Sequence, residues 1–440
     1  MRLSLPKLFA ASLTALAVSA CDDTTAPVPQ KLVNVLLDFC SNDTPVWFAF
    51  QAEGGQWTQL SPNTEGTYSF QANNHTALAF VRQSGGDYRT EIIYATSTDL
   101  EKISGQACLE EGGTKQVNGT IAGLGVAQSA FVTMNFSSVK LDPPQASFSL
   151  VQLAERPLDV VASRANVTAT TQSADRIIIR RSRNFVNNAS MPVLDFASAE
   201  ALIPTTFTTT ISGLGAGETT LLQNNFFSQL ETSQTLFALA GVANGSTSVV
   251  GVPATTLAAG DYHDLFAFGV TATGIVRGSE RFFHAPSNQT LALSGTLAAP
   301  LVTTLGTTPY VRLRAELARQ SEYGGAMNVE YSQQHSNFTV TTVSLSATEA
   351  YFDAHRWVVD IPDLSNVAGW QNSWGLISGG GAIDWNVSAH SGRPELIFGA
   401  KPNDGETVNF SSRASSTSAI QAFTSGLATV RRPRPFARAR

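Results

Sequence analysis

The chain has 440 residues, of which 43% are hydrophobic and only 14% are charged, and its formal net charge is −6. This length allows several domains, while the charged fraction lies well below the roughly 25% of an ordinary soluble protein. An acidic chain argues against nucleic acid as the main partner, because phosphate binding needs a surplus of Lys and Arg. Abundant Thr, Ser and Phe favour strands over helices.

The first twenty residues have the organisation of a secretory signal peptide. Arg2 and Lys7 form a short basic region, and residues 8–18 are an apolar run that is shorter than the roughly 20 residues needed to span a bilayer. The run ends in Ala17-Val-Ser-Ala-Cys21, which resembles the lipobox of bacterial lipoproteins. The resemblance implies cleavage of residues 1–20 and a lipid anchor on Cys21, with acyl chains that add about 0.8 kcal/mol per buried CH₂. The alternative is an ordinary signal peptide with a chance Cys at its cleavage site.

Residues 21–30 form a polar tether that contains two prolines. In the lipoprotein interpretation the protein is a lipid-anchored protein of the cell envelope, with the outer membrane favoured. Asp22 leaves the inner membrane open, because an Asp directly after the lipidated Cys favours inner-membrane retention in enteric bacteria. We predict no transmembrane helix, since no later run of 18 apolar residues occurs.

Cys40 and Cys108 are the two remaining cysteines. An even pair in an oxidising compartment predicts a disulfide, which would close a loop of about 68 residues and contribute roughly 4 kcal/mol. Two separate buried thiols are the alternative. Short alternating apolar runs around these cysteines predict one β-sandwich over residues 31–112. Its expected strands are 33–39, 45–50, 66–70, 77–81 and 90–94.

An internal repeat follows, because the motif at residues 120–125 (TIAGLG) recurs at residues 210–215 (TISGLG). Two copies 90 residues apart predict tandem sandwiches over residues 113–205 and 206–299, rather than a solenoid with a period of roughly 20–50 residues.

The second copy continues to Thr220 as GLGAGETT, which resembles a phosphate-binding loop. Such a loop needs a Lys to reach the phosphates, whereas Glu218 stands here and would repel them. The strand-like flanks predict instead a hairpin turn in both copies. Gly123 and Gly125, with their partners in the second copy, are expected to supply the positive φ.

After Pro300, alternating runs predict a C-terminal sandwich over residues 300–411. The expected strands are 310–315, 329–332, 338–345, 357–361 and 383–387. Single helical turns are expected at residues 198–202 and 348–351. Residues 412–440 are Ser/Thr-rich and then Arg/Pro-rich, which predicts a disordered tail, although its arginines could also contact anionic lipid.

No catalytic residue, metal site or cofactor is predicted. The six His residues show no metal-ligand spacing, and neither a CxxC nor a GxSxG motif occurs. The densest group of potential ligands is Asp261-Tyr-His-Asp264. It could hold a cation, or His263 and Asp264 could bond the backbone at the start of a strand. A pair of catalytic acids, as in glycosidases, stays open because only the fold sets their separation.

Trp370, Trp374 and Trp385 lie within 16 residues of one another. Exposed aromatic rings between Gly-rich loops can stack on sugars, so these three residues are the candidate ligand-binding site. The alternative is that they are buried in a sandwich core.

Beyond the lipobox, the chain resembles multi-domain immunoglobulin-like β-sandwich lipoproteins of environmental Gram-negative bacteria. The predicted class is therefore all-β, with tandem antiparallel sandwiches. The resemblance brings no known activity, so the expected function is non-catalytic binding, adhesion or scaffolding, with no cofactor. A carbohydrate-binding module or carbohydrate-active enzyme, or an accessory subunit of an envelope or uptake assembly, are the alternatives. Expected partners are the membrane, through the anchor, and a glycan or envelope protein, with no nucleic acid and an open oligomeric state.

Overall fold

The computed structural model describes residues 33–38, 44–64, 66–103, 115–135, 137–336, 338–352, 356–398 and 400–416. These residues are built almost entirely from strands, so the predicted all-β class is confirmed. Cys21, Cys40 and Cys108 lie outside the described residues, and the signal peptide, lipid anchor and disulfide stay predictions. Most of the Arg-rich tail also lies outside the described residues, so its disorder stays a prediction. The division into domains stays a prediction as well. No helix in the described ranges is long and apolar enough to cross a bilayer.

The strands fall into four groups in chain order. Group I contains β1 (Val33–Asp38), β2 (Trp47–Ala52), β3 (Thr58–Gln59), β4 (Thr67–Ala72), β5 (Thr76–Ser84), β6 (Asp87–Ala95) and the helix α1 (Ser97–Ile103). Group II contains β7 (Lys115–Ala122), β8 (Gln128–Met134), β9 (Ser137–Leu141), β10 (Ser147–Leu153), β11 (Leu158–Val167), β12 (Thr171–Arg183), β13 (Ala189–Ser190) and β14 (Leu194–Asp195).

Group III contains β15 (Thr205–Ser212), β16 (Thr219–Phe227), β17 (Ser233–Ala240), β18 (Gly245–Gly251), the 3₁₀ helix η1 (Ala254–Thr256), β19 (Tyr262–Val270), β20 (Val276–Phe283) and β21 (Gln289–Ala292). Group IV contains β22 (Leu301–Gly306), β23 (Arg312–Ala318), η2 (Ser321–Tyr323), β24 (Ala326–Gln334), β25 (Val340–Thr348), η3 (Glu349–Tyr351), β26 (Arg356–Asp360), η4 (Asn372–Trp374), β27 (Ile383–His390), η5 (Pro394–Phe398) and β28 (Thr407–Ala414).

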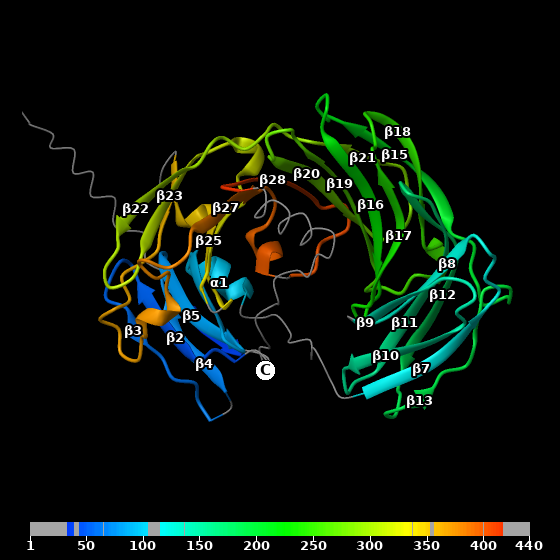
Figure 1. Cartoon of the computed structure of the whole chain (residues 1–440), viewed down its shortest axis with the longest axis horizontal. Coiled ribbons are helices and arrows are strands. Elements are labelled where there is room, and N and C mark those ends of the chain that lie inside the picture. The colour runs from blue at the N-terminus through cyan, green and yellow to red at the C-terminus, as the bar shows by residue number, and fades with distance from the viewer. Residues whose placement is uncertain are drawn as a thin grey trace, which may run out of the picture.

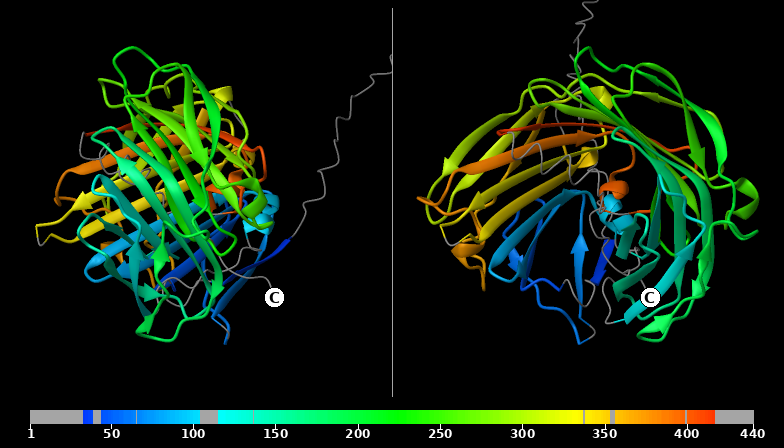
Figure 2. Two further views of the ribbon diagram at one scale, coloured as in Figure 1. Left: turned by 90° about the vertical axis from the view of Figure 1, so that its right-hand side faces the viewer. Right: turned by 45° about the vertical axis from the view of Figure 1, so that its right-hand side comes forward.

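One sheet of sixteen strands runs through all four groups, in the order β3-β2-β5-β6-β25-β24-β27-β28-β20-β19-β16-β17-β12-β11-β8-β9. Each group contributes four adjacent strands. The sheet curves into an arch, with the strands of groups I and II at its two ends (Figure 1). The turned views show the strong twist along this sheet that follows from the handedness of strands (Figure 2).

Each group repeats one topology. In group II, β7 and β10 pair in a second sheet, while β12-β11-β8-β9 lie side by side in the long sheet. The same pattern appears as β6-β5-β2-β3 in group I, β20-β19-β16-β17 in group III and β28-β27-β24-β25 in group IV. The four groups are therefore copies of one β-sandwich topology.

The order of the long sheet is symmetric about its centre. The antiparallel pair β28–β20 joins groups IV and III, and the same sequence of strand types runs outward from it in both directions. The junction between groups I and IV joins β6 to β25, and that between groups II and III joins β12 to β17. The sheet thus consists of two similar halves, although β6–β25 is parallel and β12–β17 is antiparallel.

Alternating burial explains how each sandwich forms. In β15 the side chains of Phe207, Thr209 and Ile211 are buried, while the intervening Thr and Ser side chains are exposed. The inward face packs on Leu222 of β16 and Leu265 of β19 in the long sheet. The alternation of buried and exposed side chains therefore turns one face of the second sheet of group III towards the long sheet.

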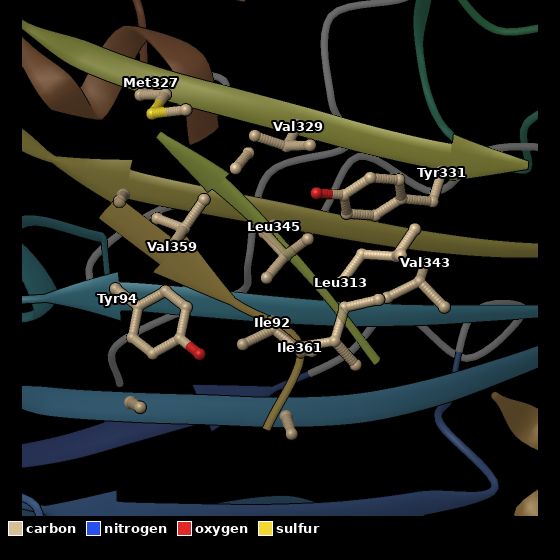
Figure 3. Close-up of a cluster of buried hydrophobic side chains, with 14 of the residues drawn as sticks. Ile92, Tyr94, Leu313, Met327, Val329, Tyr331, Val343, Leu345, Val359 and Ile361 are labelled. Carbon is tan, nitrogen blue, oxygen red and sulfur yellow. The ribbon is translucent and has the colours of Figure 1, made fainter. Parts of the chain in front are cut away.

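The largest core joins the first group to the last. Trp47, Ala79 and Ile92 project from one face of the group I strands and pack with group IV side chains, while Phe48 and Phe80 pack in a different cluster, against β1 and β4. Figure 3 shows β23 and β26 lying across β24, β25 and β6, with side chains from all five strands meeting between them. Group I is consequently covered on both faces of its sheet.

The segment GLGAGETT is a turn but not a hairpin. Gly213 has the predicted positive φ, 85°, as does Gly123, 75°, whereas Gly125 and Gly215 are not among the positive-φ residues. The turn connects β15 in the second sheet to β16 in the long sheet. The hairpin prediction was wrong because the alternating pattern identifies a strand without identifying the sheet that it joins.

Local helices differ from the prediction in two places. Residues 348–351 contain the expected turn, as η3. Residues 198–201 also form a turn, closed by the Ala201 amide and the Ser198 carbonyl at 3.2 Å, but it is not helical, and Leu202 forms a β-bridge with Ile177. The helix α1 was not predicted. Its Asp99 accepts hydrogen bonds from the amide and the hydroxyl of Thr96, and its Leu100 enters the core of group I.

Candidate functional site

The predicted tryptophan site lies within the core that joins groups I and IV. The ring centroid of Trp370 is 5.1 Å from that of Trp47 and 5.5 Å from that of Trp374, and Trp374 is only 6% exposed. Trp385 lies on β27 and packs at the edge of the same core, without ring contact to these tryptophans. Edge-to-face contacts with neighbouring rings pack Trp370 and Trp374 into this core, and a glycan-binding role of the three tryptophans stays a prediction.

Hydrogen bonds across this junction reinforce the ring contacts. The indole N–H of Trp47 donates to the Ala368 carbonyl at 2.9 Å. The hydroxyl of Thr90 donates to the Trp374 carbonyl at 2.8 Å, and that of Tyr94 to the Asp360 carbonyl at 2.6 Å. Burial raises the pKa of Tyr94 well above its usual value, so the phenol stays a donor. Groups I and IV are therefore fixed relative to each other.

His263 bonds the backbone, as one of the two interpretations of the Asp261–Asp264 segment expected. Its Nε2 accepts from the Val252 amide at 2.9 Å, and its Nδ1 lies 2.9 Å from the His284 carbonyl. Burial lowers the pKa of His263 to about 4, against the opposing effect of the His284 hydrogen bond. The neutral imidazole is thus held between two strands.

Asp261 belongs to a charge cluster between groups II and III. Its Oδ1 accepts from Arg181 at 2.8 Å and from the Gln229 amide at 2.7 Å. Arg181 also reaches Asp159 at 3.4 Å. No set of three or more His, Cys, Asp or Glu in the described ranges is placed to hold a metal ion.

The carboxylate of Glu218 fills the loop that resembled a phosphate cradle. Its Oε2 accepts from the Gly215 amide at 2.8 Å, and its Oε1 accepts from Arg277 at 2.9 Å. Burial acts to raise the pKa of Glu218, but the hydrogen bonds from Arg277 and Gly215 outweigh it and lower the pKa. An anion would meet a negative charge at the place where it would have to bind.

A polar pocket lies at one end of group IV and was not predicted. It is open to solvent, has a volume of about 660 Å³ and is lined by Arg319, Ser321, Gly324, Glu349, Ser391 and Gly392. This volume is within the range of small-molecule sites, roughly 300–1,000 Å³. Three connections converge there: β23–β24, β25–β26 and β27–β28.

The β27–β28 connection is long, because residues 391–406 separate the two strands. The corresponding connections in groups I, II and III are only residues 85–86, 168–170 and 271–275. Connections in compact domains are usually much shorter, and this one has room for the 3₁₀ helix η5. The Gly- and Pro-rich composition of this segment was the sequence signal that could have identified the site.

Together, the fold and this site define an all-β protein of four sandwiches that share one continuous sheet, with a polar pocket among the loops of the last group. No family model matches the chain, and no curated protein matches it significantly.

The chain shows similarity to several solved structures at low sequence identity. A tetra-tandem repeat from the extending region of a large adhesion protein is 13% identical, with a TM-score of 0.14, over 88% of this chain and 95% of that one. The Bacillus anthracis TIE protein is 8% identical, with a TM-score of 0.15, over 86% of this chain and 65% of that one. The pilus adhesin SpaC from Lactobacillus rhamnosus GG is 6% identical, with a TM-score of 0.12, over 72% and 44%. These TM-scores are too low to carry an argument about function.

Proposed function

We propose that the chain is a lipid-anchored protein of the cell envelope with a non-catalytic role in binding, adhesion or scaffolding. The observation that carries this proposal is the continuous sixteen-stranded sheet, whose strand groups are joined by shared buried cores. Such junctions hold the four sandwiches as one rigid frame, unlike tandem domains on flexible linkers. A rigid frame on a tether can present a surface at a fixed geometry.

Several arginines form ion pairs within the fold, which supports a structural role for these charges. Arg181, Arg277 and Arg393 each pair with carboxylates within the fold, at N–O distances of 2.5–2.9 Å in their closest pairs. Paired groups of this kind position strands and loops. The open pocket of group IV is the place where a ligand could contact the frame.

Membrane fractionation of cells that express the wild-type chain or the Cys21→Ala variant tests the anchor. We expect the wild type in the membrane fraction and the variant in the soluble fraction, because the substitution removes the acyl chains. A Ser19→Thr variant, which leaves Cys21 in place, is the control for nonspecific effects near the cleavage site. Unchanged membrane retention of Cys21→Ala contradicts the lipid anchor.

Binding to whole cells or envelope fragments tests the second half of the proposal. The purified full-length chain should be retained by envelope material of its host. Circular dichroism of the same sample shows that the retained chain is folded, which excludes nonspecific adhesion of unfolded protein. Turnover of an envelope polymer by the purified chain would contradict the non-catalytic role.

A further inference from the structure

The pocket of group IV lies among three connections at one end of its sandwich: β23–β24, β25–β26 and β27–β28. If the pair β23–β26 is aligned with strands B and E of an immunoglobulin domain, the strands β24, β25, β27 and β28 correspond to C, C′, F and G. The pocket then lies among the B–C loop, the loop that leaves C′ and the F–G loop. In variable domains these loops at one end of the sandwich carry recognition. This is an analogy of position, and the chemistry must come from the residues themselves.

Backbone contacts hold the three loops in place. The Gly325 amide donates to the His390 carbonyl at 2.7 Å, and the Glu349 amide donates to the Gly325 carbonyl at 2.9 Å. A Cβ atom at Gly325 would lie 2.5 Å from the Gly392 carbonyl oxygen and 2.9 Å from that of His390. Glycine is therefore required where the loops meet, and these backbone contacts order the loops before any ligand arrives.

The long β27–β28 connection is also held by ion pairs. Arg393 donates to both oxygens of Glu406, at 2.8 and 2.9 Å. Glu395 is almost fully buried and pairs with Lys102 of α1 at 3.2 Å. The wall of the pocket is thus braced against group I as well as within its own loop.

The charged groups of the pocket are one cation and one anion. The guanidinium of Arg319 pairs with the carboxylate of Glu349, and each side chain is 40% exposed. An exposed ion pair of this kind contributes little to stability, so a ligand with matching charges can replace it without a large loss. Ser321 and Ser391 add hydroxyl groups to the lining, and the Ser391 hydroxyl oxygen also accepts from the Asn409 amide at 2.7 Å.

The lining indicates the class of ligand. None of the six lining residues is aromatic or aliphatic, so neither sugar stacking nor an apolar ligand is favoured. The guanidinium fork fits a carboxylate, and the Glu349 carboxylate fits an ammonium group. We propose that this pocket binds a zwitterionic amino-acid or short-peptide ligand, with its carboxylate on Arg319 and its ammonium group on Glu349. The proposal deepens the binding role proposed above and rests on it.

Calorimetry with the purified full-length chain in detergent tests this proposal. The probes are glycylglycine, its N-acetylated form, its C-terminal amide and glucose. We expect glycylglycine to bind and either blocked form to bind at least about tenfold more weakly, because each loses one charged hydrogen bond. Glucose should give no heat.

Variants identify the site. Glu349→Gln and Arg319→Gln should each weaken glycylglycine binding at least about tenfold. Glu316→Gln, which removes the partner of Arg356 in another ion pair of group IV, should leave glycylglycine binding unchanged. Far-UV circular dichroism checks the fold of each variant. Gly324 is close to Glu349 and has space for a side chain. Gly324→Ser should therefore narrow the pocket and weaken glycylglycine binding without removing a charge.

Three outcomes overturn the inference: no binding of glycylglycine at millimolar concentration, equal binding of a blocked dipeptide, or tighter binding of glucose. Because this assay needs neither the anchor nor cells, its failure alongside retained envelope binding removes the ligand class and leaves the proposed function standing. Loss of envelope binding alone would instead remove the proposed function.

Discussion

Trp47 offers the sharpest test of the shared core of groups I and IV. Its side chain is 3% exposed, and its indole N–H donates to the Ala368 carbonyl of group IV at 2.9 Å. Burying roughly 200 Å² of aromatic surface at about 25 cal/mol per Å² gives about 5 kcal/mol as an upper value. The lost hydrogen bond adds about 1 kcal/mol. Trp47→Ala should therefore lower the free energy of unfolding by about 3–5 kcal/mol, the usual range for such truncations.

Urea unfolding followed by far-UV circular dichroism measures this change. A double-mutant cycle separates the contact between groups from a local effect. Trp47→Ala and Trp370→Ala should be coupled by about 0.5 kcal/mol or more, because the two rings touch. Trp47→Ala and Phe207→Ala should be additive, since Phe207 belongs to the separate core of group III. A loss below about 1 kcal/mol together with additivity of the Trp47 and Trp370 changes would refute a shared core.

Two further predictions concern pH and packing. His263 is neutral in the fold, with a pKa lowered to about 4 by burial, whereas the unfolded chain takes up this proton near pH 6.5. The stability that neutral His263 contributes is therefore complete above about pH 6.5, and it should fall by about 3 kcal/mol as pH drops towards 4. Burial also lowers the pKa of His390 to about 4, so His390 adds to the fall. Urea unfolding across that range checks the slope, and a flat profile contradicts the assignment. Gly278→Ala should cost about 1–3 kcal/mol through overpacking, because the Phe410 ring and the Ala267 carbonyl occupy the space that a Cβ would need. Adding Phe410→Leu should recover part of that loss in thermal unfolding, and no recovery would point to the backbone contact alone.

The strands themselves were predictable from local pattern. The run at residues 383–387 alternates apolar and polar side chains and lies within β27, and residues 77–81 lie within β5. Residues 120–125 and 210–215 also indicated that β7 and β15 are equivalent. Period-two alternation is a local property, so it appears in a single sequence.

The pairing of strands and the position of the pocket could not be predicted from local sequence patterns. β6 lies beside β25, about 250 residues later in the chain, as in their paired residues Glu91 and Ser344. No local pattern specifies such a partner. The tryptophans looked like a surface cluster because Trp47, which packs among them, is far away in sequence.

Arg319 and Glu349 likewise come together only through the topology of group IV. Each is a single charged residue beside a strand, a position that is usually solvated. The Gly- and Pro-rich segment between β27 and β28 was visible in the sequence. That it is an unusually long connection became clear only when the four groups were aligned, because the other three have short connections at this position.

Amide hydrogen exchange across the β6–β25 junction tests most directly the claim that four sandwiches form one continuous sheet. Residues 90–94 of β6 pair with residues 343–347 of β25, so the β6 amides that point towards β25 have hydrogen-bond partners in group IV. The account predicts that these amides exchange as slowly as the β6 amides bonded to β5, because both sets lie inside the sheet. Fast exchange of the amides facing β25, with slow exchange of those facing β5, would show β6 to be an open edge and would contradict the continuous sheet.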